Sequence, residues 1–215
     1  MPFAIKLRTL ALRRLLEPSV RKFLVTRMSR DEAGRTLEAV WRGYSESASA
    51  VPKGEGFGPT QVLHLAAITI ALHQALTDSG RSDEAATQIV VDVGWVVYRK
   101  MGAVAWMLSR TAGKDQLQRM RAATQMFRRF PFSSPAYQWK EVAAEANVVA
   151  FDCVRCPAAQ YFASRNRSAL CVQTFCNLDF PLAKDWGAEL ERSGSIAGGA
   201  ERCDFRWRHG AKHPT

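Results

Sequence analysis

The hydrophobic residues of this chain change their spacing near residue 147, and that change sets the fold class. Before it, apolar residues recur at the three- and four-residue steps of amphipathic helices, without the period of two that strands show. After it, the run 147–153 and the alternating runs 189–196 and 202–208 are typical of strands. The chain therefore predicts an α+β fold, with an N-terminal helical half packed on a small C-terminal antiparallel sheet.

Helical periodicity predicts long helices over residues 3–25, 31–46, 60–77, 82–110 and 114–129. The first is either one basic amphipathic helix or two shorter ones broken near Pro18. Ser, Gly and Pro are frequent between residues 45 and 59, which is typical of a connection. We therefore expect residues 1–55 to form a basic amphipathic helical arm and residues 56–215 to form the main domain, with helices and the antiparallel sheet.

The positive charge of the chain is concentrated at its start. The net charge is +10, and residues 1–30 carry eight Lys or Arg against one acid, Glu17. Such a segment is either a helix packed on the domain with a solvated basic face or a contact for an anionic membrane surface or an acidic partner. No nucleic-acid-binding motif accompanies it, so we expect no specific nucleic-acid partner.

All five cysteines fall in the last third of the chain, at Cys153, Cys156, Cys171, Cys176 and Cys203. An odd number cannot pair completely into disulfides, and free thiols are typical of a reducing cytoplasm. The apolar residues near the start are interrupted by arginines, so we expect no secretory signal. The apolar run 89–108 contains charged residues, which predicts a buried helix rather than a membrane span.

Three of the cysteines stand in short blocks: Cys156-Pro157, Cys176 with Asp179 three residues later, and Gly199-x-x-x-Cys203-Asp204-Phe205. These blocks, in this order, resemble the L-2-amino-thiazoline-4-carboxylic acid hydrolase family. The last block is also similar to the end of vinyl-reductase-type small-molecule-binding domains. The first resemblance implies a hydrolase that opens a small cyclic amidine or isothiourea carboxylate at a C–N bond, and leaves Cys153 and Cys171 without an assigned role.

We expect the catalytic residues to be Cys156, Cys176, Asp179 and Cys203. A thiolate attacks carbon only if its pKa is lowered by a cation, a helix start or a metal. Cys156 precedes Pro157 at an expected helix N-terminus, where unpaired amides favour negative charge. Asp179 could act as the general base or orient the attacking water, or it could cap a turn.

Metal binding is a second possibility for the same thiols. Cys156, Cys176 and Cys203 could hold a divalent metal such as zinc and leave one position open for an activated water. A metal-free site with one nucleophilic thiolate is equally allowed, and so are cysteines that merely pack in the core. The sequence does not decide the cofactor.

The remaining site residues concern the substrate. Arg192 and Arg202 are expected to bind the carboxylate of a small-molecule substrate, because a guanidinium matches that group in two places. Asp204 is a further substrate-binding candidate. The alternative to an enzyme is a non-enzymatic module that binds a metal or a small ligand through a thiolate cluster, and such a module would not need Asp179.

Overall fold

The computed structural model describes residues 3–113 and 115–209 and confirms the α+β class. The first half forms the long helices α1 (Phe3–Leu24), α2 (Arg30–Ser47), α3 (Phe57–Asp78), α4 (Asp83–Leu108) and α5 (Gln116–Arg129). Side chains cap three of them: Ser29, Ser82 and Asp115 each accept hydrogen bonds from backbone N–H groups of the first turn of α2, α4 and α5. Short 3₁₀ segments, Ala48–Ala50 and Ser109–Ala112, follow α2 and α4.

Helix α1 is continuous, so of the two alternatives for this segment the single helix holds. Pro18 lies inside it, on its exposed side, where water can satisfy the carbonyl group that loses its partner. The buried residues Leu12, Val20 and Leu24 face α2, α3 and α4. The domain boundary expected near residue 55 stays a prediction.

The sheet has four antiparallel strands: β1 (Gln138–Glu141), β2 (Val148–Arg155), β3 (Ala188–Glu191) and β4 (Cys203–His209). Their order is β1-β2-β4-β3, so β4 lies between β2 and β3. In the register of β2 with β4, Cys153 lies opposite Cys203 and Phe151 opposite Phe205. The sequence did not reveal β1, because this edge strand is exposed along most of its length and does not alternate.

Gly198-Gly199 between two alternating runs predicts a tight hairpin turn at this point. Strands β3 and β4 do pair as consecutive antiparallel strands, but the predicted tight turn is wrong. Strand β3 ends at Glu191, and the connection to β4 includes a 3₁₀ helix, Ile196–Gly198, followed by Gly199 in a left-handed conformation with φ of 94°. The carboxylate of Asp204 accepts hydrogen bonds from the backbone N–H groups of Ser193 and Gly194 at 3.1 and 3.0 Å. These bonds satisfy backbone groups that a longer strand would have paired.

Between β2 and β3 the chain forms α6 (Pro157–Ala163), α7 (Ser168–Thr174), the 3₁₀ helix η3 (Cys176–Leu178) and α8 (Asp179–Asp185). The expected helix start at Cys156-Pro157 is confirmed, since Cys156 is the N-cap residue of α6. Helix α8 includes most of residues 181–186, which the sequence predicts to be a connection, so that prediction is wrong. Pro181 is compatible with this helix because the first turn of a helix needs no N–H donor.

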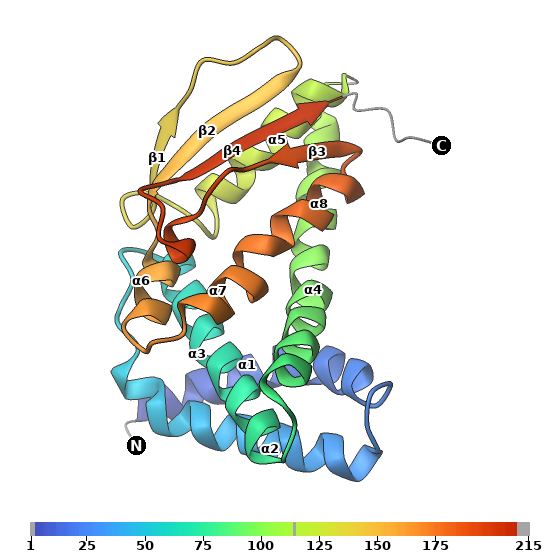
Figure 1. Ribbon diagram of the computed structural model, residues 1–215, viewed down its shortest axis with the longest axis vertical. Coiled ribbons are helices and arrows are strands. Elements are labelled where there is room, and N and C mark those ends of the chain that lie inside the picture. Colours follow the sequence, from blue (N-terminus) through green and yellow to red (C-terminus); the bar gives the residue numbers. More distant parts are fainter. Residues whose placement is uncertain (1–2, 114, 210–215) are drawn as a thin grey trace.

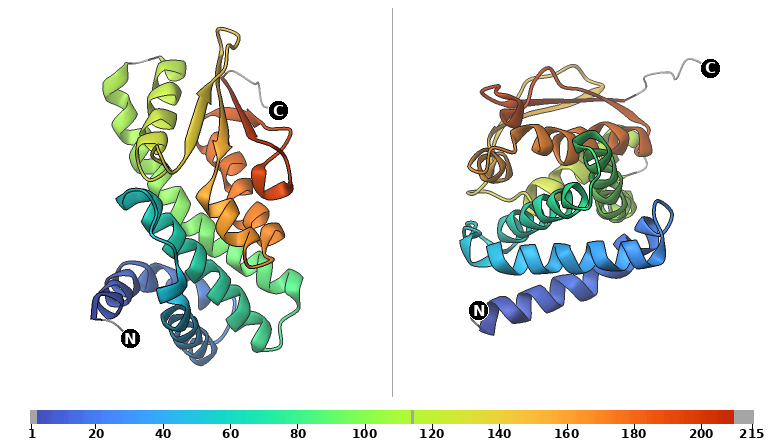
Figure 2. Two further views of the ribbon diagram at one scale, coloured as in Figure 1. Left: turned by 90° about the vertical axis from the view of Figure 1, so that its left-hand side faces the viewer. Right: turned by 60° about the horizontal axis from the view of Figure 1, so that its bottom comes forward.

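The elements form layers. Figure 2 shows α1 and α2 on one side, α3 and α4 in the middle, and the sheet on the other side with α7 and α8 beneath it. Helix α4 packs on α1, α3, α5 and α7, and it runs along much of the long axis of the molecule (Figure 1). Among the described helices, none has the length and the apolar character that crossing a membrane requires.

Candidate active site

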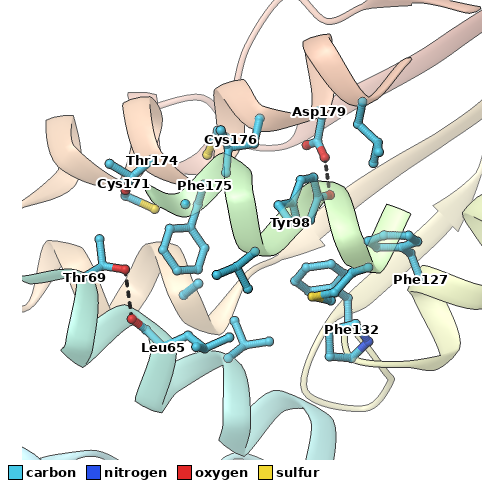
Figure 3. Close-up of a pocket in the computed structure, with 18 of the residues that line it drawn as sticks. Leu65, Thr69, Tyr98, Phe127, Phe132, Cys171, Thr174, Phe175, Cys176 and Asp179 are labelled. Carbon is cyan, nitrogen blue, oxygen red and sulfur yellow. Dashed lines mark hydrogen bonds between the residues drawn. The ribbon is translucent and has the colours of Figure 1, made fainter. Parts of the chain in front are cut away.

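A cavity lies where the sheet, α7 and α8 meet α3 and α4, and Figure 3 shows part of its lining. The space that the centres of water-sized molecules can occupy is about 220 Å³. All five cysteines contribute to its wall. Of the seven site residues predicted from the sequence, the cavity wall includes Cys156, Cys176, Asp179, Arg192 and Cys203.

Asp179 is the first residue of α8 and receives two hydrogen bonds. The hydroxyl of Tyr98 on α4 donates to Oδ1 at 2.5 Å, and Nη1 of Arg192 lies 3.5 Å from Oδ2. Burial raises the pKa of Asp179 to about 6, although both partners favour the carboxylate. A carboxyl group with this pKa can both take and release a proton near neutral pH.

Arg192 is a buried cation beside Asp179, with only 5 % of its side chain exposed. Its Nη1 also donates to the carbonyl oxygen of Cys176 at 2.9 Å. Its guanidinium lies 4.8 Å from the ring centroid of Phe180, within the range of a cation–π contact. These contacts fix the position of the positive charge, so it acts on Asp179 and Cys176 together.

Cys176 has the most activated thiol of the five cysteines. A hydrogen bond from the Cys171 thiol lowers its pKa and outweighs burial, and the charge of Arg192 and a hydrogen bond with the Ser195 side chain lower it further. The same contact and burial raise the pKa of Cys171, which therefore remains the protonated donor of the pair. Cys176 is thus the nucleophile candidate that the directions of the pKa shifts favour.

The other cysteines are protonated at neutral pH, because burial raises the pKa of each. It raises that of Cys156 to about 12 and that of Cys203 to about 11. Their sulfurs accept hydrogen bonds from the N–H groups of Ala159 and Ile196, at 3.4 and 3.3 Å. The helix start at Cys156 is present, as expected, but its effect on the thiol is smaller than that of burial.

The metal site predicted from Cys156, Cys176 and Cys203 is not supported. Within residues 3–113 and 115–209, no three His, Cys, Asp or Glu side chains come together in a way that could hold a metal ion.

Arg202 and Asp204 lie outside the cavity, in a shallow depression on the connection between β3 and β4. Nε of Arg202 lies 3.2 Å from a carboxylate oxygen of Asp152 on β2. Burial raises the pKa of Asp204, but hydrogen bonds from the Ser193 hydroxyl and from backbone N–H groups outweigh it and lower the pKa to about 2. The role of Arg202 and Asp204 in substrate binding stays a prediction.

Three residues of the site had no role in the sequence interpretation: Tyr98, Cys171 and Ser195. Tyr98 lies within an apolar helix, and the one signal was general, since a buried tyrosine hydroxyl needs a partner. Cys171 was left without a role, although it stands only five residues before Cys176. Nothing in the local sequence placed Ser195 near a thiol.

Comparison with known proteins identifies the family of the chain. No curated protein matches the chain. The family model described as L-2-amino-thiazoline-4-carboxylic acid hydrolase matches residues 61–207, which include α4, all five cysteines, Asp179 and Arg192. The match covers more than half of the 215 residues and begins after α1 and α2. The chain therefore belongs to the L-2-amino-thiazoline-4-carboxylic acid hydrolase family.

Proposed function

We propose that this protein is a hydrolase that opens a small cyclic amidine or isothiourea acid, of the 2-aminothiazoline-4-carboxylate type, at a ring C–N bond. The observation that carries the proposal is the pairing of two shifted groups at one wall of the cavity. Cys176 has a lowered pKa, Asp179 has a pKa raised to about 6, and Arg192 lies beside both. Opposed pKa shifts in adjacent groups are characteristic of a nucleophile and an acid–base partner.

In the first half of the reaction, the Cys176 thiolate attacks the carbon of the C=N bond and forms a tetrahedral adduct. Asp179, in its protonated form, gives its proton to the ring nitrogen. The exocyclic amino group then forms a C=N bond to the carbon and gives up one proton to the same ring nitrogen, and the bond from carbon to that nitrogen breaks. The nitrogen leaves as an amine that stays attached to the substrate, and the carbon remains bound to Cys176. The pKa of Asp179 near 6 leaves enough of the acid form for this step.

In the second half, the Asp179 carboxylate takes a proton from water, and the resulting hydroxide attacks the same carbon. The bond to the Cys176 sulfur breaks, and the thiolate is restored. The water oxygen ends as the carbonyl of a carbamoyl product. The N–H groups of Arg192 that are not used within the protein could bind the substrate carboxylate at the same wall.

The non-enzymatic alternative, a ligand-binding module, is favoured by the apolar character of most of the cavity wall. Incubation with 2-aminothiazoline-4-carboxylate, followed by mass spectrometry of the product, separates the two. We expect turnover by the wild type, a loss of roughly a hundredfold or more in kcat for Cys176→Ala and Asp179→Asn, and near wild-type turnover for the control Cys153→Ala. Binding without turnover in the wild type would favour the module.

We place this reaction in the cytoplasm, because all five cysteines are free in the structure. A thiolate nucleophile and four further thiols around one cavity are best preserved in a reducing compartment. The proposed chemistry depends on that state, since oxidation of Cys176 would remove the nucleophile.

A further inference from the structure

Beyond Cys176 and Asp179, the cavity is walled by apolar side chains from helices that are distant in the sequence. One stripe comes from α3 and another from α4: Val62, Leu65, Ile68 and Leu72, and Val90, Val93, Val97 and Met101. Helices α1 and α2 add Leu16, Val20 and Val40. Val90 is two helical turns from Tyr98, so this wall extends about 12 Å along α4 from the polar end, at about 1.5 Å per residue.

Most polar side chains in these walls already have partners, although Nε1 of Trp41 has none among the described residues. The hydroxyls of Thr69, Thr124 and Thr174 donate to carbonyl groups of their own helices at 2.9, 3.0 and 2.7 Å, so their methyl groups remain to line the cavity. Glu17 pairs with two arginines of α1, and Arg128 pairs with Glu141. A ligand in this part therefore meets a surface that offers it mainly apolar contacts.

The volume of the cavity also indicates that it holds a ligand. One water molecule needs roughly 10–15 Å³ of the same kind of space, and this cavity provides about 220 Å³. Empty cavities destabilise a fold in proportion to their volume, and apolar walls hold water poorly. A small polar ring bound at Asp179 would leave most of the space between α3 and α4 without a ligand.

We propose that the substrate of the Cys176 and Asp179 site carries an alkyl or aryl group, which lies between α3 and α4 while the amidine head lies at Asp179. The identity of the head rests on the proposed function. The apolar group rests on the shape and chemistry of the cavity alone. The protein would then act on apolar derivatives of cyclic amidine acids in preference to the unsubstituted ring.

Isothioureas with alkyl chains of different length test this inference without any need for turnover. S-methylisothiourea carries the head alone, and S-butylisothiourea and S-octylisothiourea add a chain. We expect calorimetric titration to show affinity rising by up to roughly fourfold for each added methylene group, the factor expected when such a group leaves water. The heat capacity change of binding should become more negative with chain length.

Two variants of α4 test whether the alkyl chain of the ligand lies in the cavity. Val97→Trp fills the cavity, whereas Val104→Trp makes the same change on the same helix at a side chain that is 52 % exposed. We expect Val97→Trp to lose the dependence on chain length and to retain binding of S-methylisothiourea, and Val104→Trp to behave like the wild type. Leu65→Phe narrows the cavity from α3 and serves if Val97→Trp does not fold.

The inference is overturned if affinity does not rise with chain length, or if it rises equally in the cavity-filling variants and in Val104→Trp. Its failure is distinguishable from failure of the proposed function. If affinity depends on chain length but no thiazoline acid is hydrolysed, the inference of an apolar ligand stands and the proposed hydrolase function is wrong. If 2-aminothiazoline-4-carboxylate is hydrolysed but affinity does not depend on the length of the alkyl chain, the proposed hydrolase function stands and the inference of an apolar group is wrong.

Discussion

Tyr98 and Asp179 are 81 residues apart in the sequence, and yet the hydroxyl of Tyr98 donates a 2.5 Å hydrogen bond to Oδ1 of Asp179. The bond joins α4 to the first residue of α8, and so it fixes the proposed acid–base group relative to the helix that lines the cavity. Because the hydroxyl stabilises the carboxylate, it holds the pKa of Asp179 below the value that burial alone would give.

Tyr98→Phe should therefore raise the pKa of Asp179. Because Asp179 must be protonated in the first half of the reaction, we expect the alkaline limb of the pH dependence of kcat/KM, which should lie near pH 6 in the wild type, to move upward by about one unit. Tyr137→Phe is the matched control, since this tyrosine also lines the cavity. An unchanged pH profile in Tyr98→Phe would show that Asp179 is not the group that titrates.

Asp179→Asn should change how stability depends on pH. The folded-state pKa of about 6 lies above the usual 3.8, so folding favours the protonated form. That contribution is complete below pH 3.8 and is lost as pH rises through 6. Since Asn does not titrate, the variant should gain up to about 3 kcal/mol relative to the wild type between pH 4 and pH 7. Urea unfolding at both pH values measures this difference, and a constant difference would contradict the shifted pKa.

Cys176 should react with iodoacetamide faster than the other cysteines at neutral pH. Its thiolate is stabilised by the Cys171 thiol, Arg192 and the Ser195 side chain. Cys171→Ala and Ser195→Ala should each move the midpoint of the alkylation rate to higher pH, by up to about one unit. Peptide mass spectrometry identifies the modified cysteine, and Cys153→Ala, which removes a buried protonated thiol, should leave the midpoint unchanged.

The two arginines predicted to bind the substrate carboxylate lie in different surroundings. Arg192 is buried in the cavity wall, whereas the Arg202 side chain is 54 % exposed and lies near Asp152. We expect Arg192→Lys to raise the KM for 2-aminothiazoline-4-carboxylate by roughly tenfold, and Arg202→Lys to raise it less. Thermal melting of both variants checks that the fold is intact. Equal increases in KM would indicate that Arg202 also binds the substrate carboxylate.

The predicted membrane contact of residues 1–30 has a surface to support it. Leu7, Leu10 and Leu15 of α1 are 58, 45 and 74 % exposed, and exposed basic residues stand between them. We expect co-sedimentation with vesicles that contain phosphatidylglycerol but not with pure phosphatidylcholine, and loss of it at high salt. Leu7→Ser combined with Leu15→Ser should weaken it, and Met107→Ser combined with Leu108→Ser is the control. Equal loss of vesicle binding in both double variants would argue against α1 as the membrane contact.

The helical half could be predicted from the sequence because its signals are local. Ser29 and Ser82 mark helix starts, and apolar stripes mark the buried faces of α2 and α4. Strand β1 and the connection from β3 to β4 could not be predicted in the same way. The first pairs at an exposed edge, and the second is held by Asp204, whose bonds exist only once the sheet has formed.

The candidate site was predictable in part for the same reason. The short block that contains Cys176 and Asp179 predicted both as catalytic residues. No local pattern, however, shows which thiol has the lowered pKa. That depends on the Cys171 thiol, the Ser195 side chain and the guanidinium of Arg192, which only tertiary packing brings to Cys176. The helix start at Cys156 was visible in the sequence, but the burial that outweighs it was not.

The strand order β1-β2-β4-β3 has a consequence for biosynthesis. Strand β4 follows the other three along the chain and fills the place between β2 and β3, so until it leaves the ribosome each of these has an unpaired edge. The same strand carries Cys203 and is followed by no other described strand. A nascent chain that stalls before residue 203 would thus expose the unpaired edge of β2 and be a target for chaperones or for aggregation.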